Sequence, residues 1–226
     1  MNDSLQKRYD ELQNAIQNTL HSFNNDQRSV NLIAVSKTFP ADDIKILYDL
    51  GHRDFGENYI QEWIGKYQSL PEDIIWHIIG DIQSNKTRIV AENADWVHTL
   101  SRIKIAERLS EARPSHLPKL NVCIEVNISG ETQKHGIHPD ELIDFAKHVQ
   151  NLPQLNLRGL MCITANADEI TVRNQMQAMQ NLFNNMINNG FNLDTLSMGM
   201  SNDWKFAIEY GATHIRVGSA LFGSRK

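Results

Sequence analysis

Residues 31–39 read NLIAVSKTF, an apolar run from Leu32 to Val35 that ends in a lysine, Lys37. The run is too short and too apolar for a surface segment, so it predicts a buried β-strand. Burying a lysine is costly because its charged form loses hydration. A buried strand that ends in this residue therefore raises two alternatives: a side chain that reaches back to water, or an amine with a chemical task.

Strands and helices alternate from this stretch to the end of the chain. Pro40 can begin the first helix and Gly51 can end it. The spacing of Leu5, Leu12, Ile16 and Leu20 predicts an additional amphipathic helix ahead of the first strand, at about 3–23. The predicted strands are 32–36, 53–56, 74–80, 95–100, 119–128, 155–163, 195–198 and 214–218, and the later helices are 58–69, 83–92, 101–112, 139–150, 168–189 and 201–210.

This alternation predicts a parallel sheet, and eight units in slightly over 200 residues fit a closed (β/α)8 TIM barrel. We predict a single domain, 1–226, with the N-terminal helix at about 3–23 and the barrel at about 30–223. A doubly wound open sheet is the alternative. That fold would more often place a glycine-rich fingerprint after its first strand, and the sequence has none there.

Composition limits the classes of binding partner and the cellular compartments that the sequence fits. The 226 residues carry a formal net charge of −5, so no basic surplus indicates nucleic-acid binding. Cys123 and Cys162 lie in apolar runs, which predicts two buried, unpaired thiols in a reducing compartment. The N-terminal segment lacks an apolar signal region and no run of ~18 apolar residues occurs, so we expect a cytoplasmic protein without a membrane anchor.

In such a barrel, functional groups collect where strands end. Two glycine turns follow the last two predicted strands: Gly199 precedes Ser201, and Gly218 precedes Ser219. Amides at a helix start, next to a glycine turn, form an anion site, and these two loops usually hold phosphate in TIM barrels. Alternatively, both glycines make tight turns and Ser201, with Asn202, only caps its helix.

Lys37 and Arg216 add chemistry to the predicted phosphate site. Desolvation and a nearby cation such as Arg216 would lower the pKa of Lys37, leaving a nucleophilic amine that forms a Schiff base with a carbonyl. A sugar-phosphate aldolase and a pyridoxal 5′-phosphate site both fit this combination. Arg216 could face the pyridine nitrogen of the cofactor, or it could pair with a rim carboxylate such as Glu57.

Six ordered motifs resemble the pyridoxal phosphate homeostasis proteins of the YggS and PROSC type, which are similar to the barrel domain of alanine racemase. The motifs are AVSKTFP, FGENYIQE, WHIIGDIQSNKTR, LRGLMCI, LSMGMSNDWKFAI and GATHIRVGSALFG. The resemblance covers about residues 30–223 and implies a pyridoxal phosphate-binding TIM barrel with Lys37 as the Schiff-base lysine. It further implies that Arg216 faces the pyridine nitrogen, that Ser201, Gly218 and Ser219 hold the phosphate near the backbone of Met200, and that Asn58 and His77 line the ring.

The sequence departs from the family pattern at a few positions. Asp81 stands where proline is common, Ser219 where threonine is common, and Asn202 where aspartate is frequent. We expect Asp81 to add negative charge near the mouth of the barrel and to weaken anion binding slightly. We expect the usual short C-terminal tail to be nearly absent.

The resemblance bears on whether the protein is an enzyme. Arginine at the pyridine nitrogen makes the ring a weaker electron sink, and racemisation needs a base on each face of the substrate carbon. The second base of the racemases lies on a separate domain that we expect to be missing, and Tyr59 is the only tyrosine near the rim. We therefore predict a non-catalytic monomer that holds and delivers pyridoxal phosphate, with recipient enzymes as partners; a weak racemase acting through Lys37 and Tyr59 is the alternative.

Two further motifs remain outside this site. His135 and His138 lie close together, but no third ligand stands at a suitable spacing, so we predict no metal site and a solvated loop. Lys86 and Arg88 open a helix as an ordinary polar turn, or they present cations to an anion or to a partner.

Overall fold

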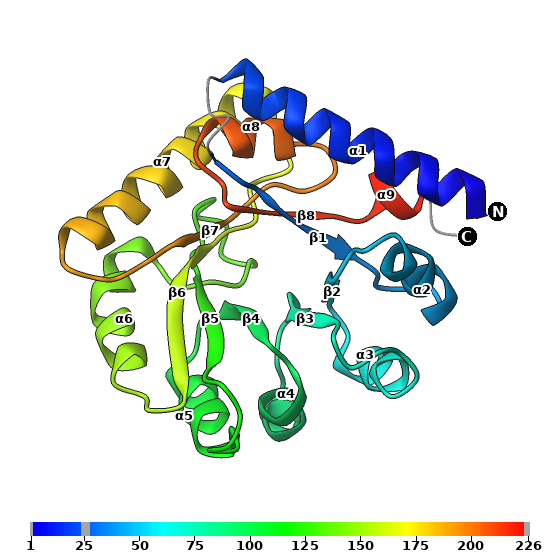
Figure 1. The fold of residues 1–226 in the computed structure, drawn as a ribbon. Coiled ribbons are helices and arrows are strands. Elements are labelled where there is room, and N and C mark those ends of the chain that lie inside the picture. Colours follow the sequence, from blue (N-terminus) through cyan, green and yellow to red (C-terminus); the bar gives the residue numbers. More distant parts are fainter. Residues whose placement is uncertain (1, 24–27, 224–226) are drawn as a thin grey trace.

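Eight parallel strands close into one barrel, in the order β1 to β8, in the computed structural model, which describes residues 2–23 and 28–223 (Figure 1). This confirms the predicted (β/α)8 fold. The strands are β1 Asn31–Val35, β2 Asp54–Glu57, β3 Ile75–Ile78, β4 Trp96–Leu100, β5 Leu120–Glu125, β6 Leu155–Met161, β7 Thr195–Ser197 and β8 His214–Val217. The helices are α1 Asn2–Ser22, α2 Ala41–Asp49, α3 Ile60–Tyr67, η1 Ser84–Lys86, α4 Thr87–Asn93, α5 Ile103–Ala112, η2 Pro139–Glu141, α6 Leu142–Gln150, α7 Glu169–Asn188, α8 Trp204–Glu209 and α9 Ser219–Phe222.

Several predicted elements are shorter in the structure, and two of these differences bear on the site. The fifth strand ends at Glu125 rather than at 128, because the chain turns outward and Val126 forms an isolated bridge with Ile137. The helix after β7 begins at Trp204 rather than at 201. Residues 126–137 and 198–203 are therefore loops at the carboxyl ends of their strands, where they are available to build a site.

The two faces of the strands differ in chemistry. The larger hydrophobic core lies between strands and helices and includes Phe55, Trp63 and Trp76. The opposite face points into the barrel, where Trp96, Cys123 and Met161 form a smaller apolar cluster. Registered neighbours share a face, so the pairing of Ile33 with Arg216 and of Gly56 with His77 also places Arg216 and His77 inside the barrel.

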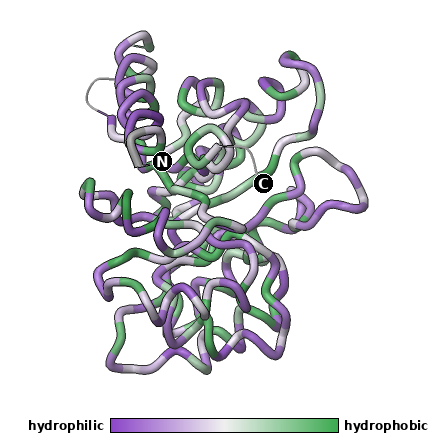
Figure 2. The backbone as a smooth tube through the Cα atoms, turned by 90° about the vertical axis from the view of Figure 1, so that its right-hand side faces the viewer, coloured by the Kyte–Doolittle hydropathy of each residue, from purple (hydrophilic) through white to green (hydrophobic). Residues whose placement is uncertain are grey.

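Helix α1 completes the outer layer. It contacts α2, α8 and α9 and lies along the outside of the barrel beside β8 and β1 (Figure 1). Hydrophilic and hydrophobic residues alternate along it (Figure 2), and Leu5, Leu12, Ile16 and Leu20 are buried, as their spacing predicts. Arg8 Nε donates to the carbonyl of Leu221 at 2.6 Å, which attaches α1 to α9. Because α9 is only four residues long, α1 occupies the position that a full helix after β8 would fill.

Candidate active-site cavity

A cavity of about 660 Å³ opens at the carboxyl ends of the strands. This volume is ordinary for a small-molecule site. Its walls come from β1, β8, the starts of α7 and α8, and the loops after β1, β2, β3, β5, β6, β7 and β8. Seven of the eight predicted cofactor-binding residues line it: Lys37, Asn58, Met200, Ser201, Arg216, Gly218 and Ser219.

Lys37 lies in a tight turn directly after β1 and is half-buried. The next residue, Thr38, has a φ of 68°, and it is the one non-glycine residue with positive φ in the described part of the chain. A β-branched residue is disfavoured in this left-handed region, so surrounding contacts must hold the turn. The Thr38 amide donates to Glu62 Oε1 at 2.6 Å.

An ionic network beneath this turn supplies the restraint. Lys66 Nζ on α3 donates to the carbonyl of Ser36 at 2.8 Å and to Glu57 Oε1 at 2.7 Å, and it also pairs with Glu62. Ser36 Oγ donates to Glu57 Oε1 at 2.7 Å. Burial raises the pKa of Glu57, while its contacts with Lys66 and Ser36 act in the opposite direction. The three charged side chains together fix the backbone on both sides of Lys37, and the sequence analysis did not single out Lys66 or Glu62.

Arg216 reaches the cavity from inside the barrel and is almost fully buried. Its Nη1 donates to Ser197 Oγ and its Nη2 to the carbonyl of Cys162, both at 2.8 Å. The alternative ion pair with Glu57 does not form, because Glu57 lies between β2 and α3, where Lys66 is its partner. Burial lowers the pKa of Arg216. An arginine nevertheless stays protonated in proteins, so it presents fixed positive charge to the cavity.

The loops after β7 and β8 meet at Ser201. Its Oγ accepts hydrogen bonds from the amides of Gly218 and Ala220, each at 3.3 Å. Ser201 thus joins two loops, and the expectation that it caps the following helix is wrong, because that helix starts three residues later. Gly199 has a φ of +92°, and a Cβ there would lie 2.5 Å from Ala207 Cβ, so only glycine fits this turn.

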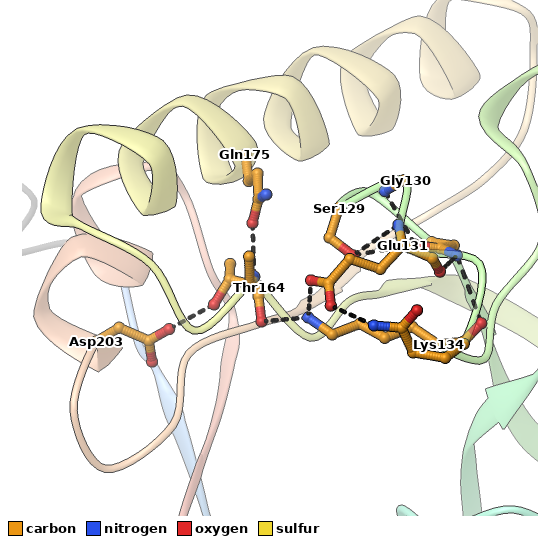
Figure 3. Close-up of polar contacts among 10 residues, drawn as sticks. Ser129, Gly130, Glu131, Lys134, Thr164, Gln175 and Asp203 are labelled. Carbon is orange, nitrogen blue, oxygen red and sulfur yellow. Dashed lines mark hydrogen bonds and ion pairs between the residues drawn. The ribbon is translucent and has the colours of Figure 1, made fainter.

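The backbone of Met200 is already engaged within its loop. Its amide donates to Asp203 Oδ1 at 2.6 Å, and Asp203 Oδ2 accepts from Thr164 Oγ1 at 2.8 Å. Figure 3 shows the hydrogen bond between Thr164 and Asp203. It also shows a second connection between neighbouring loops, in which Lys134 Nζ contacts Glu131 and the carbonyl of Thr164. The loops after β5, β6 and β7 are therefore tied together, and Lys134 and Thr164 line the cavity without having been predicted.

Asn58 and His77 differ in their placement. Asn58 lines the cavity, and its side-chain oxygen is buried with no hydrogen-bond partner among the described residues. Gly80 passes so close to Asn58 that a Cβ would lie 2.1 Å from its carbonyl oxygen. His77, by contrast, is absent from the cavity walls. It is fully buried inside the barrel and bonded to Asp54 and His98, which corrects the expectation that it lines a ring.

Secondary expectations from the sequence have clear outcomes. Asp81 pairs with Arg102 at 2.7 Å, which compensates the charge expected to weaken anion binding. Tyr59 is 56% exposed and does not line the cavity. No cluster of three metal-ligating side chains occurs in residues 2–23 and 28–223, and His138 instead caps the short helix η2. The two cysteines are buried and unpaired, as predicted.

Lys86 and Arg88, the two cations at the helix that follows β3, have local partners. Lys86 Nζ donates to Gln61 Oε1 at 3.0 Å, and Arg88 pairs with Glu92 one turn along its helix. Both lie outside the cavity walls.

Comparison with known proteins places the chain in a family. The family profile described as alanine racemase, N-terminal domain, matches residues 10–226. A pyridoxal phosphate homeostasis protein from Pasteurella multocida (strain Pm70) is 46% identical over 221 residues, which is 95% of each chain. The chain belongs to the pyridoxal phosphate homeostasis protein family. The family member from Pseudomonas aeruginosa PAO1 is 50% identical over 201 residues, covering 88% of this chain and 86% of that protein.

A solved structure agrees with this family assignment. PipY from Synechococcus elongatus PCC7942, determined with PLP bound, superimposes with a TM-score of 0.79 at 35% identity and covers 92% of this chain and 100% of its own. In the chain described here, no helix within residues 2–23 and 28–223 is long and apolar enough to cross a membrane.

Proposed function

We propose that the chain binds pyridoxal 5′-phosphate in this cavity, attached through Lys37, and serves in cofactor homeostasis by holding and delivering it. One observation carries the proposal: a lysine, a permanently charged arginine and a set of hydroxyl and amide groups line the same cavity. Family membership and the PLP-bound state of PipY support the choice of cofactor over a sugar phosphate.

The residues present fit the chemistry of this cofactor. Ser201, Ser219 and the amides of Gly218 and Ala220 lie together at the end of β8, where they would hold the phosphate. Arg216 would face the ring nitrogen. The side-chain oxygen of Asn58 has no hydrogen-bond partner among the described residues, which supports a contact with a ligand, since buried polar groups normally have a partner.

Lys37 would supply the covalent link. Its neutral amine would add to the aldehyde carbon, and a C=N bond would form with loss of one water. When bound, the cofactor supplies an electron sink. Arg216 would limit this capacity, because a group that stays protonated can only donate a hydrogen bond and so leaves the ring nitrogen without a proton.

We propose that the chain has no robust turnover of its own. A racemase needs a base on each face of the substrate carbon, and Lys37 can serve only one. No tyrosine lines the cavity within the described residues, and Tyr59, the candidate second base, points to solvent for more than half of its surface. We further propose a cytoplasmic monomer whose partners are enzymes that receive the cofactor.

Absorbance tests the proposal. Protein incubated with pyridoxal phosphate should show a band near ~420 nm, as expected for a cofactor linked to a lysine. Borohydride should fix the cofactor on the peptide that contains residue 37, which mass spectrometry would identify. Lys37→Ala should lose both signals, whereas Lys45→Ala, at an exposed position on α2, should keep them.

Two results would contradict parts of this proposal. A wild-type protein that cannot be loaded with pyridoxal phosphate would exclude the cofactor assignment. Interconversion of D- and L-alanine above the Lys37→Ala background would overturn the non-catalytic part alone.

A further inference from the structure

A line of buried polar side chains runs through the barrel from Arg216 to the opposite rim. Arg216 Nη1 lies 2.8 Å from Ser197 Oγ, and Ser197 Oγ lies 3.0 Å from His98 Nδ1. His98 Nε2 is 2.9 Å from His77 Nδ1, and His77 Nε2 is 2.9 Å from Asp54 Oδ1. Ser197, His98 and His77 are fully buried. The proposed function assigns no role to any of the four partners of Arg216 in this line.

The chemistry of the two ends fixes the direction of the first and the last hydrogen bond. A guanidinium only donates and an ionised carboxylate only accepts. Arg216 must therefore donate to Ser197 Oγ, and His77 must donate from Nε2 to Asp54. If both rings are neutral, His77 Nδ1 accepts from His98 Nε2, and His98 Nδ1 accepts the hydroxyl proton of Ser197. Every donor then meets one acceptor.

Two other arrangements of protons would fit the same distances. In one, His77 would carry protons on both nitrogens, and in the other His98 would; in both, His98 would donate from Nδ1 to Ser197 Oγ. The hydroxyl of Ser197 would then receive two donors, and its own proton would find no further acceptor among the described residues. Each of these arrangements also buries an imidazolium beside the ring of His214.

The surrounding charges favour the neutral arrangement. Burial, with the positive charge of Arg216 acting in the same direction, holds the pKa of His98 well below its usual value. Burial lowers the pKa of the neighbouring His214 to about 4. Although burial would raise the pKa of Asp54, hydrogen bonds from His77 and Asn31 bring it below its usual range, so this end remains an acceptor.

We propose that Ser197, His98, His77 and Asp54 form a directed hydrogen-bond chain that positions Arg216 at the cavity, with both histidines neutral and protonated on Nε2. These four are positioning residues, since only Arg216 would contact the ligand. In this hydrogen-bond chain the Ser197 hydroxyl donates its proton to His98 Nδ1, so Ser197 Oγ always presents a lone pair to Arg216. The consequence for pyridoxal phosphate rests on the proposed function, but the proton arrangement does not.

Nitrogen-15 NMR of histidine-labelled protein without cofactor tests the arrangement directly. At pH 7, His77 and His98 should both appear as neutral Nε2–H tautomers. Their resonances would be assigned from variants in which one histidine at a time is replaced. A His98 ring protonated on Nδ1, or a doubly protonated His77, would overturn the inference. This outcome depends on neither cofactor binding nor the folding of a Ser197 variant.

Removing the central hydroxyl tests the positioning role. Ser197→Ala should change the His98 Nδ1 signal and raise the Kd for pyridoxal phosphate roughly fivefold, the equivalent of one hydrogen bond. Thr195→Val is the matched control, because it removes a buried hydroxyl on the same strand that donates to Asp194 and, among the described residues, lies outside the Arg216 line. Equal Kd values for the two variants would overturn the positioning role. If the wild type binds no pyridoxal phosphate, the proposed function fails. The histidine tautomers would still show whether the proposed hydrogen-bond chain is present.

Discussion

Two polar networks approach the cavity from opposite faces of the strand wall. The outer network lies between β2 and α3 and consists of charged groups, with Glu57 and Glu62 around Lys66. The inner network lies inside the barrel, where Ser197, His98 and His77 connect Arg216 to Asp54. The outer network holds a backbone turn, whereas the inner network holds a side chain.

The difference shows how two kinds of restraint suit two kinds of group. Opposite charges around a strained turn resist displacement strongly, but losing one partner leaves another charge buried. A chain of neutral groups avoids that penalty and gains a defined direction, because each member must donate on one side and accept on the other. Lys37 is thereby placed through its backbone and Arg216 through its hydrogen-bond partner.

The largest effect is expected from breaking the outer network at its centre. Lys66→Met should lower the free energy of unfolding by about 3–5 kcal/mol, because Glu57 would remain buried without its cation. Urea denaturation followed by circular dichroism would measure this loss. Lys147→Met is the control, since Lys147 is 65% exposed and pairs only at the surface, and it should cost less than about 1 kcal/mol. Equal losses for the two variants would show that the network contributes nothing beyond surface pairing.

Acid should lower the free energy of unfolding by protonating His214, which lies inside the barrel. The pKa of His214, lowered to about 4 mainly by burial, lies below its value of 6.5 in the unfolded chain. The unfolded state therefore binds more protons between these values, so stability from this group is complete above pH 6.5 and is lost as pH falls towards 4. We expect a loss of about 2 kcal/mol at pH 5 relative to pH 7.

The contribution of His214 can be isolated by substitution. The difference in unfolding free energy between wild type and His214→Gln should shrink by this amount on acidification, as measured by urea denaturation at both pH values. A pH-independent difference for His214→Gln would show that the ring is not held neutral.

The smallest effect is expected at the turn that the outer network restrains. Thr38→Asn should raise the free energy of unfolding by about 0.5–1 kcal/mol, because asparagine tolerates positive φ better than a β-branched residue. Thermal unfolding would detect the rise. Thr171→Asn, near the start of α7, offers a control in a helical backbone, where no such gain is expected. A loss of stability in Thr38→Asn would show that the threonine side chain itself supports the turn.

Much of this organisation could be predicted from local pattern. Short apolar runs that alternate with amphipathic segments define the strands and helices, and the closure of eight such units into a barrel brings their ends together. Lys37 could therefore be assigned to the same rim as Arg216 and Gly218, although it is far from both in the chain. The prediction depended only on which residues end strands.

Other features depend on which side chains meet, and a sequence does not display this. Lys66 stands four residues after Glu62, a spacing typical of an exposed helical pair, so its burial under the Lys37 turn gave no signal. The resemblance implies that His77 lines the ring, but its side chain is buried inside the barrel and is absent from the cavity walls. Ser201 precedes a helix and has good capping chemistry, yet its partners come from the loop after β8.

The attachment of α1 to α9 also concerns how the chain reaches its fold. Arg8 contacts Leu221, which is 213 positions away, and β1 pairs with β8. Helix α1 also packs against the nearby α2, but it gains its contacts with α8 and α9, and β1 its pairing with β8, only when the C-terminal part of the barrel is in place. Such long-range closure slows folding, since the entropy of a long loop is lost before the contacts form. Until that moment the apolar face of α1 and the edge of β1 lack part of their native cover, so ring closure is the step at which this barrel most needs protection from aggregation.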